Sequence, residues 1–326
     1  MKSIAGVVLI TFVLTLGIIA QTPAPTAPAQ RGGGGRGNQN TGPQNLAWVD
    51  RTGKVLGTIG APQAAILDPS ISPDGKKVVV RGRDTAQETE HAYIHEGTTK
   101  HRVTTNEGSE RHEIWSPKGD RIAFSMQVAG QGTVSNLFIR NADGSGKDEP
   151  LVVSEGMHKW SPTWAPDGKF IVYHTNELAT NARDIGFVDV KTHKTDFLVQ
   201  SPAIEALPRF SSDGKFVAYQ AQADANAKWE VFVTTFPKSD AKWKIGEGQW
   251  PRWSKDEIFY WQDNALMSVK FSVKGKDFTV GTPQKLFTGP QVGMGNGTIG
   301  GYNFFYDYRD GKFVVVQRPP AAAAGQ

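Results

Sequence analysis

The chain of 326 residues contains no cysteine. This excludes disulfide bonds, thiolate nucleophiles, lipid attachment to an N-terminal cysteine, and zinc or iron–sulfur sites built from cysteine ligands. A basic patch is also missing, because the 36 Lys and Arg are scattered among 32 Asp and Glu, for a net charge of +4. No nucleic-acid-binding motif accompanies these charges, so we expect no nucleic-acid partner.

Long hydrophobic runs are absent except at the N-terminus. Met1-Lys2 is a short basic start, and an uncharged apolar run follows over residues 4–20. This pattern predicts a secretory signal peptide over residues 1–20, and therefore a periplasmic or secreted protein. The run is also close to the lower limit of about 17 residues for a spanning helix. The alternative is that this segment is not cleaved and remains in the membrane. We expect no other contact with the membrane.

Two segments have compositions that cannot bury enough apolar surface to order themselves. Residues 21–45 are rich in Pro, Ala and Gly, and residues 319–326 are Pro and Ala followed by Gly-Gln. We therefore expect a disordered linker and a disordered tail at these positions. The folded domain is predicted to span residues 46–318.

One short pattern recurs through this domain. An apolar or aromatic residue is followed by a tight polar turn and then by a strand-like run. The turns, at positions 74, 118, 167, 213, 256 and 310, lie 43 to 54 residues apart. A period of roughly 40–50 residues built from strands is typical of a β-propeller. The clearest copies are Ile71-Ser72-Pro73-Asp74-Gly75, Trp115-Ser116-Pro117-Lys118-Gly119, Trp164-Ala165-Pro166-Asp167-Gly168 and Phe210-Ser211-Ser212-Asp213-Gly214.

The sixth repeat is incomplete at its C-terminal end. Residues 302–308 and 312–318 supply two strands, whereas the other repeats have four. Residues 46–53 and 54–60 have the pattern of the two missing strands. We therefore predict an all-β, six-bladed β-propeller of four-stranded antiparallel blades. Its ring is closed by N-terminal strands that pair with C-terminal strands, which removes exposed sheet edges.

These repeats resemble the periplasmic TolB-like β-propeller family. The resemblance rests on the turns above, on strands such as Lys169-Phe170-Ile171-Val172-Tyr173 and on the Asn141-Ala142-Asp143-Gly144 turn. It covers about residues 46–318 and implies a six-bladed propeller that binds proteins or small ligands. The repeats are also similar to sensor propellers fused to some bacterial kinases. A detached sensor domain for cell-wall fragments is therefore a further interpretation.

Polar residues fall at the predicted channel mouth formed by the links between blades and the loops between strands two and three. Our leading hypothesis is an exported, non-enzymatic scaffold that binds an envelope protein or a small ligand there without a cofactor. The candidate ligand-binding residues are Asp68, Glu110, Arg111, His112, His158, Lys159, His174, Glu205 and Gln249.

Four of these residues allow an alternative. Imidazole and carboxylate groups suit Zn, Mn or Fe, so a divalent metal could bind to His112, His158, His174 and Glu205. The protein would then be a metal-assisted lyase or hydrolase acting on a sugar or lactone. The spacing of the four residues follows no local metal-binding motif.

Aromatic residues are expected at the contacts between blades. We predict that Trp115, Trp164, Phe210, Trp253 and Tyr306, at the start of the hairpin turns, pack between neighbouring blades. The sequence places two further tryptophans, at positions 160 and 250, nearer the mouth, where they either pack or stack on a ligand.

Overall fold

The computed structural model describes residues 43–105, 108–128, 130, 132–275, 277–294 and 305–318. The predicted signal peptide and the predicted tail lie outside these residues, as does most of the predicted linker. The described domain begins with a strand at Gln44, two residues before the predicted boundary. Among the described residues, no helix has the length and apolar character needed to cross a bilayer.

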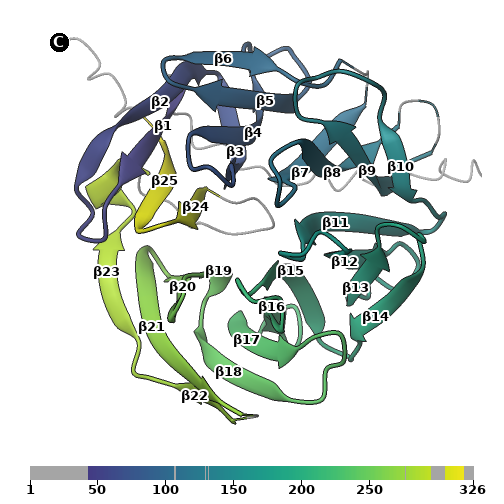
Figure 1. The fold of residues 1–326 in the computed structure, drawn as a ribbon, viewed down its shortest axis with the longest axis vertical. Coiled ribbons are helices and arrows are strands. Elements are labelled where there is room, and N and C mark those ends of the chain that lie inside the picture. Colours follow the sequence, from purple (N-terminus) through teal and green to yellow (C-terminus); the bar gives the residue numbers. More distant parts are fainter. Residues whose placement is uncertain are drawn as a thin grey trace, which may run out of the picture. The chain divides into compact units, whose positions relative to one another are not determined.

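Six antiparallel sheets are arranged in a ring around a central axis, which confirms the predicted fold class (Figure 1). Blade 1 contains β3 (Ala65–Ile71), β4 (Lys77–Arg83), β5 (His91–Glu96) and β6 (Thr99–Arg102). Blade 2 contains β7 (Ser109–Trp115), β8 (Arg121–Gln127), β9 (Ser135–Asn141) and β10 (Glu149–Val152). Blade 3 contains β11 (Met157–Trp164), β12 (Phe170–Glu177), β13 (Ile185–Asp189) and β14 (Thr195–Val199).

The remaining blades complete the ring. Blade 4 contains β15 (Ile204–Phe210), β16 (Phe216–Gln222), β17 (Glu230–Thr235) and β18 (Lys242–Glu247). Blade 5 contains β19 (Gln249–Trp253), β20 (Glu257–Gln262), β21 (Ala265–Lys274) and β23 (Gln284–Thr288). It also carries β22 (Asp277–Val280), which pairs with the end of β21 as a hairpin that the sequence pattern did not predict.

Blade 6 is built from both ends of the described domain. β24 (Tyr306–Arg309) and β25 (Lys312–Gln317) pair in one sheet with β1 (Gln44–Val49) and β2 (Val55–Gln63). The order is β2-β1-β25-β24, so β1 and β25 form the central ladder. In Figure 1, purple and yellow strands share this sheet. The predicted closure of the ring is therefore confirmed.

The hydrophobic core lies between neighbouring blades. One cluster joins Val79 and Ile94 of blade 1 to Phe124 and Phe138 of blade 2. Fully burying one such side chain contributes roughly 1.5–3 kcal/mol, so the faces between blades hold the ring together. Trp115 supports this packing, because its Nε1 donates a hydrogen bond of 3.0 Å to the carbonyl of Ser70.

The last hairpin corrects one assignment. Its equivalent of Trp253 is Tyr308, because Trp253 pairs with Ile258 and Tyr308 pairs with Phe313 at the same loop length. Tyr306, predicted for this position, lies two residues earlier. It is fully buried, and its hydroxyl donates a hydrogen bond of 2.5 Å to the carbonyl of Trp250.

The innermost strand of blades 1 to 5 carries the same irregularity. Its pairing with the second strand shifts register three residues before the residue that begins the hairpin turn (Ile71 in blade 1, an aromatic in blades 2 to 5), as in a β-bulge. The residue there has a left-handed φ of 53° to 59°. An L-residue in this region costs roughly 1–2 kcal/mol, so the packing around it must compensate. We call these five the bulge residues: Asp68, His112, Ser161, Leu207 and Trp250.

Candidate functional site

Three of the charged residues predicted for the link-side mouth contact the preceding blade or the link that leads from it. Glu110 is fully buried; its Oε2 accepts a hydrogen bond of 2.9 Å from the backbone N–H of Ala92 and another from the hydroxyl of Thr104. Lys159 is also buried, and its Nζ donates to Asn136 Oδ1 at 2.8 Å. Both side chains therefore bind the preceding blade.

The same position has the same role in blades 4 and 1. Glu205 is fully buried and accepts a hydrogen bond from the hydroxyl of Ser201, in the link from blade 3. Burial raises the pKa of Glu205 to about 7 and lowers the pKa of Lys159 to about 8. In blade 1 the backbone N–H of Ile66 donates to Gln44 Oε1 at 2.7 Å. These positions are contacts between blades in the structure.

The three predicted histidines lie near one another. His158 stacks on Trp160 with ring centroids 4.5 Å apart, and the Trp160 ring meets His174 edge-on at 5.8 Å. Burial lowers the pKa of His174 well below its usual value, and the charge on nearby His112 adds to the effect. Burial likewise lowers the pKa of His112.

Glu205 lies in a different contact, at the link between blades 3 and 4. Within the described residues, which include all four predicted ligands, no group of three or more His, Asp or Glu side chains could hold a metal ion. The structure therefore does not bring His112, His158, His174 and Glu205 together as one metal site.

The channel wall between blades 1 and 2 is ionic. Asp68 Oδ2 lies 3.3 Å from Arg81 Nε, and Arg81 also lies 3.4 Å from Glu90. Burial, together with the charge on Asp68, raises the pKa of Glu113 well above its usual value. Of the predicted mouth residues, Arg111 is exposed, and Gln249 and His158 are half-buried.

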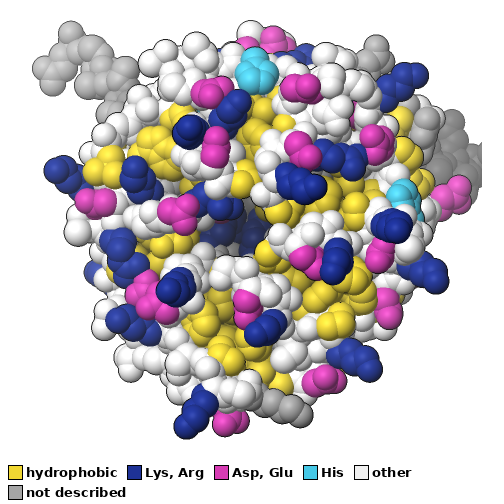
Figure 2. All heavy atoms as spheres, in the orientation of Figure 1, with side chains coloured by type: hydrophobic (Ala, Val, Ile, Leu, Met, Phe, Trp, Pro, Cys, Tyr) yellow, Lys and Arg dark blue, Asp and Glu magenta, His cyan; other side chains and the backbone are white. Residues whose placement is uncertain are grey.

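The opposite face, where the hairpin turns lie, has a central cavity of about 590 Å³. Figure 2 shows one face hollowed at its centre, with Lys and Arg side chains inside the hollow. Every blade contributes lining residues to this turn-side cavity. Each blade supplies the residue just before the one that begins its hairpin turn, which is Ile71 in blade 1 and an aromatic in the others. We call these six the inner ring: Ser70, Ile114, Thr163, Arg209, Arg252 and Asp307.

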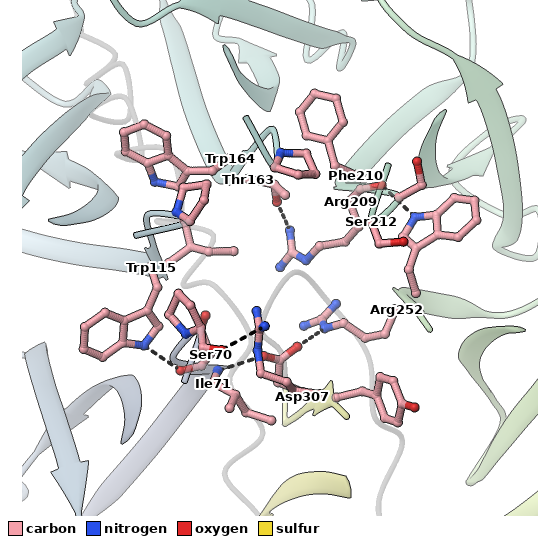
Figure 3. Close-up of a pocket in the computed structure, with 18 of the residues that line it drawn as sticks. Ser70, Ile71, Trp115, Thr163, Trp164, Arg209, Phe210, Ser212, Arg252 and Asp307 are labelled. Atoms are coloured by element: carbon pink, nitrogen blue, oxygen red, sulfur yellow. Dashed lines mark hydrogen bonds and ion pairs between the residues drawn. The ribbon is translucent and has the colours of Figure 1, made fainter. Parts of the chain in front are cut away.

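Two arginines of the inner ring project into the turn-side cavity from neighbouring blades (Figure 3). Arg209 NH1 donates to Thr163 Oγ1 at 2.7 Å and to the carbonyl of Pro208 at 2.8 Å. Arg252 Nε donates to Asp307 Oδ1 at 2.7 Å. Both arginines are buried, so each guanidinium is held in a fixed orientation at the base of a polar, water-accessible hollow.

The inner ring was not among the predicted site residues, because polar residues were expected to form a site only at the links between blades and the loops between strands two and three. A signal was present in two repeats. Pro208-Arg209-Phe210 and Pro251-Arg252-Trp253 place an arginine between a proline and the hairpin aromatic. A strand residue next to an aromatic that packs against one neighbouring blade points to the opposite side of the strand. In an innermost strand this position borders the channel, as the cavity lining shows.

Comparison with known proteins supports the fold from independent directions. The model of the TolB beta propeller domain matches residues 50–257. The Tol-Pal system protein TolB of Anaeromyxobacter dehalogenans (strain 2CP-C) is 27% identical over 126 residues. That match covers 38% of this chain and 27% of the relative, so the chain spans about a quarter of that protein.

Two solved structures have the same fold. A protein assigned as TolB from Agrobacterium tumefaciens superposes with a TM-score of 0.63 at 16% identity, covering 85% of this chain and 99% of its own. TolB from Acinetobacter baumannii superposes with a TM-score of 0.50 at 15% identity, covering 75% and 66%. At these identities the likeness is one of architecture. With the family model matching most of the ring, the chain belongs to the TolB β-propeller family.

Proposed function

We propose that this protein is an exported binding scaffold that holds an envelope protein in its turn-side cavity, with no cofactor and no catalysis. The relative from Anaeromyxobacter dehalogenans is by name a component of the Tol-Pal system, which supports a protein partner in the cell envelope. The predicted signal peptide supports a periplasmic or secreted location.

The turn-side cavity is the observation that carries this proposal. It is a polar hollow of about 590 Å³ to which all six blades contribute. Such a hollow, with a few fixed polar groups and apolar walls, has the size and character of a ligand site. At the link-side mouth, in contrast, Glu110, Lys159 and Glu205 are committed to contacts between blades. Because Arg111 is exposed and Gln249 is half-buried, that mouth is a secondary contact surface.

Site-specific photo-crosslinking in living cells tests the choice of face. A crosslinking amino acid is placed at Ser212 or Lys255 on the cavity rim, at Arg111 on the link face, or at exposed Lys191 outside the cavity. We expect one envelope protein to be captured from both rim positions and not from Lys191. Capture from Arg111 alone would move the site to the link face.

A blocking variant tests whether the cavity itself is needed. Ser212→Trp places a large ring at the rim, and Lys191→Trp is the matched control. We expect the first variant to lose the crosslink from Lys255 while the second keeps it. An unchanged crosslink in Ser212→Trp would contradict the proposal.

Cell fractionation tests export. Deletion of residues 2–20 is expected to move the protein from the envelope fraction to the cytoplasm, whereas the full chain with a C-terminal epitope tag stays in the envelope. A cytoplasmic full chain would contradict the proposed location.

A further inference from the structure

Two adjacent blades place a guanidinium at the same position of the turn-side cavity. Arg209 and Arg252 are equivalent residues of β15 and β19, and both immediately precede the hairpin aromatic. Their exposures are 9% and 4%, so each is almost entirely removed from bulk water. In Figure 3 the two side chains extend toward the same central space. A pair of buried like charges is costly unless opposite charge compensates it.

Each guanidinium is anchored by the protein on one side. Arg252 NH1 donates to the carbonyl of Pro251 at 2.9 Å, and NH2 donates to the carbonyl of Tyr306 at 3.2 Å. Its charge also lies over the Tyr306 ring, 5.2 Å from the centroid. Arg209 is anchored through Thr163 and its own proline carbonyl, as described above. Little conformational entropy is therefore lost when a ligand binds to these side chains.

The inner ring supplies one carboxylate for these two cations. Asp307 Oδ1 accepts from Arg252, and Oδ2 accepts a hydrogen bond of 2.8 Å from the backbone N–H of Ile71 in blade 1. Beyond Asp307, the carboxylate that acts electrostatically on Arg209 is Asp68, which forms an ion pair with Arg81. The inner ring therefore carries two positive charges and one negative charge. The rest of the cavity lining adds two charges of each sign, from Lys255, Arg309, Asp256 and Asp310, so the surplus remains one.

Burial lowers the pKa of Arg209 well below its usual value, and the neighbouring charge on Arg252 lowers it further. Asp307 and Asp68 partly offset this effect. An arriving anion would therefore relieve repulsion that the two arginines exert on each other. This favours binding of negative charge beside Arg209.

The charge surplus and the walls of the cavity together select the ligand. A surplus of one matches a monoanion, because a dianionic group would be repelled by the Asp307 carboxylate. Guanidinium matches the planar geometry of a carboxylate, to which it can donate two parallel hydrogen bonds. The walls contain Ile114 and prolines at positions 73, 117 and 166, which suit an apolar segment attached to that carboxylate.

We propose that the Arg209–Arg252 pair is a carboxylate-binding subsite that receives a peptide carboxylate from the protein partner. This inference rests on the proposed function, since it names the chemical group of the partner that the turn-side cavity recognises. The carboxylate belongs either to the end of a chain or to an acidic side chain, and the experiment separates these sources.

Isothermal titration calorimetry on the full chain uses three short probes. They are acetyl-alanyl-leucine with a free C-terminal carboxylate, the same peptide as its C-terminal amide, and acetyl-leucyl-glutamyl-leucine amide. We expect at least one carboxylate peptide to bind about tenfold more tightly than the neutral amide, because hydrogen bonds between charged partners are the stronger class. Whichever carboxylate peptide binds more tightly identifies the source. Equal affinity of all three, or no binding of any, would overturn the proposal.

Three variants locate the subsite. Arg209→Gln is expected to weaken binding of the carboxylate peptide by about tenfold or more. Lys191→Gln, which removes an exposed positive charge outside the cavity, is the matched control and should change the affinity by less than about twofold, since exposed charges are screened. Asp307→Asn removes the competing carboxylate and should tighten binding. Circular dichroism of each variant verifies folding.

The outcomes separate this subsite from the proposed function. If Asp307→Asn fails to tighten binding and Arg209→Gln fails to weaken it, the subsite is wrong. In that case a crosslink that still requires an open cavity would leave the scaffold function standing. If the carboxylate peptide binds as predicted but Ser212→Trp retains the crosslink, the subsite is right and the choice of cavity for the partner is wrong.

Discussion

Leu46 and Val316, near the two ends of the described domain, are direct partners in the ladder between β1 and β25. Both side chains are buried, and they share one cluster with Ile66 and Val78 of blade 1. The ladder thus closes the sheet of blade 6 and also completes the contact between blade 6 and blade 1.

Truncation after Asp310 tests this closure, because it removes β25. We expect the shortened protein to lose its cooperative thermal transition, since β1 would become an unpaired edge and β24 would lose its strand partner. Truncation after Arg318 is the control and should leave the transition temperature unchanged. Circular dichroism during heating measures both. A cooperative transition in the shorter protein would show that the ring holds without its closing ladder.

Ser161→Gly tests the strain at the bulge residues. Ser161 has a φ of 53° and is fully buried, and its hydroxyl makes no hydrogen bond within the described part of the chain. Glycine adopts this φ without steric cost, so we expect stabilisation of about 1 kcal/mol in urea unfolding. Ser161→Ala removes the same hydroxyl but keeps the strain, so the glycine variant should be the more stable of the two by about 1 kcal/mol. Equal stability of the two variants would argue against a strained bulge.

The raised pKa of Glu205 predicts how the stability of the protein depends on pH. Burial raises its pKa in the folded protein from 4.5 to about 7. Between these values the folded state retains a proton that the unfolded state has lost, so the contribution of Glu205 to stability decreases as pH rises. Glu205→Gln should therefore be more stable than wild type at about pH 8 and closer to it at about pH 4.5.

Urea unfolding at the two pH values measures this difference, and Glu155→Gln, at an exposed glutamate, is the control. If the difference in stability between wild type and Glu205→Gln does not change with pH, the effect is ruled out.

Thr163 connects blades 3 and 4 beneath the turn-side cavity. Its hydroxyl accepts from Arg209 NH1 and donates to the carbonyl of Pro208 at 2.9 Å. Thr163→Val removes these hydrogen bonds from buried polar groups and should destabilise the protein by about 1–3 kcal/mol. Thr163→Ser keeps the hydroxyl and should cost less. Urea unfolding compares the two, and equal losses would show that the methyl group contributes as much to stability as the hydroxyl.

Metal analysis tests the alternative drawn from the sequence. Since the four predicted ligands do not lie in one cluster, we expect purified protein to retain no stoichiometric divalent metal. His112→Ala and His158→Ala should then have the same metal content as wild type. One equivalent of metal that both variants lose would reinstate the metal-assisted lyase or hydrolase.

The ring could be predicted because its signals are local and repeated. The turn at Trp164-Ala165-Pro166-Asp167-Gly168 specifies a hairpin by itself, and five related copies specify the number of blades. The closure by β1 followed from counting strands in the incomplete repeat. β22 could not be predicted, because its pairing with β21 depends on aromatic packing such as the Phe271–Phe278 stack, 5.1 Å between centroids.

The candidate site was harder to predict because a polar residue near the channel has two possible roles. Glu110 and Lys159 fall where a mouth residue should lie, yet their side chains turn sideways to the preceding blade. The direction depends on the bulge that follows, where His112 and Ser161 adopt a left-handed φ. A bulge interrupts the regular alternation of side chains along a strand, so this change of side-chain direction cannot be predicted from the alternation.

The position of Asn45 opposite Gln317 has a mechanical consequence. β1 and β25 are antiparallel, so the two points where the chain joins the ring lie at the same end of one ladder. A force that pulls on both ends would therefore unzip this ladder one pair at a time, rather than shear all its hydrogen bonds together. We expect the ring to open at low tension along this seam before any other blade is disturbed.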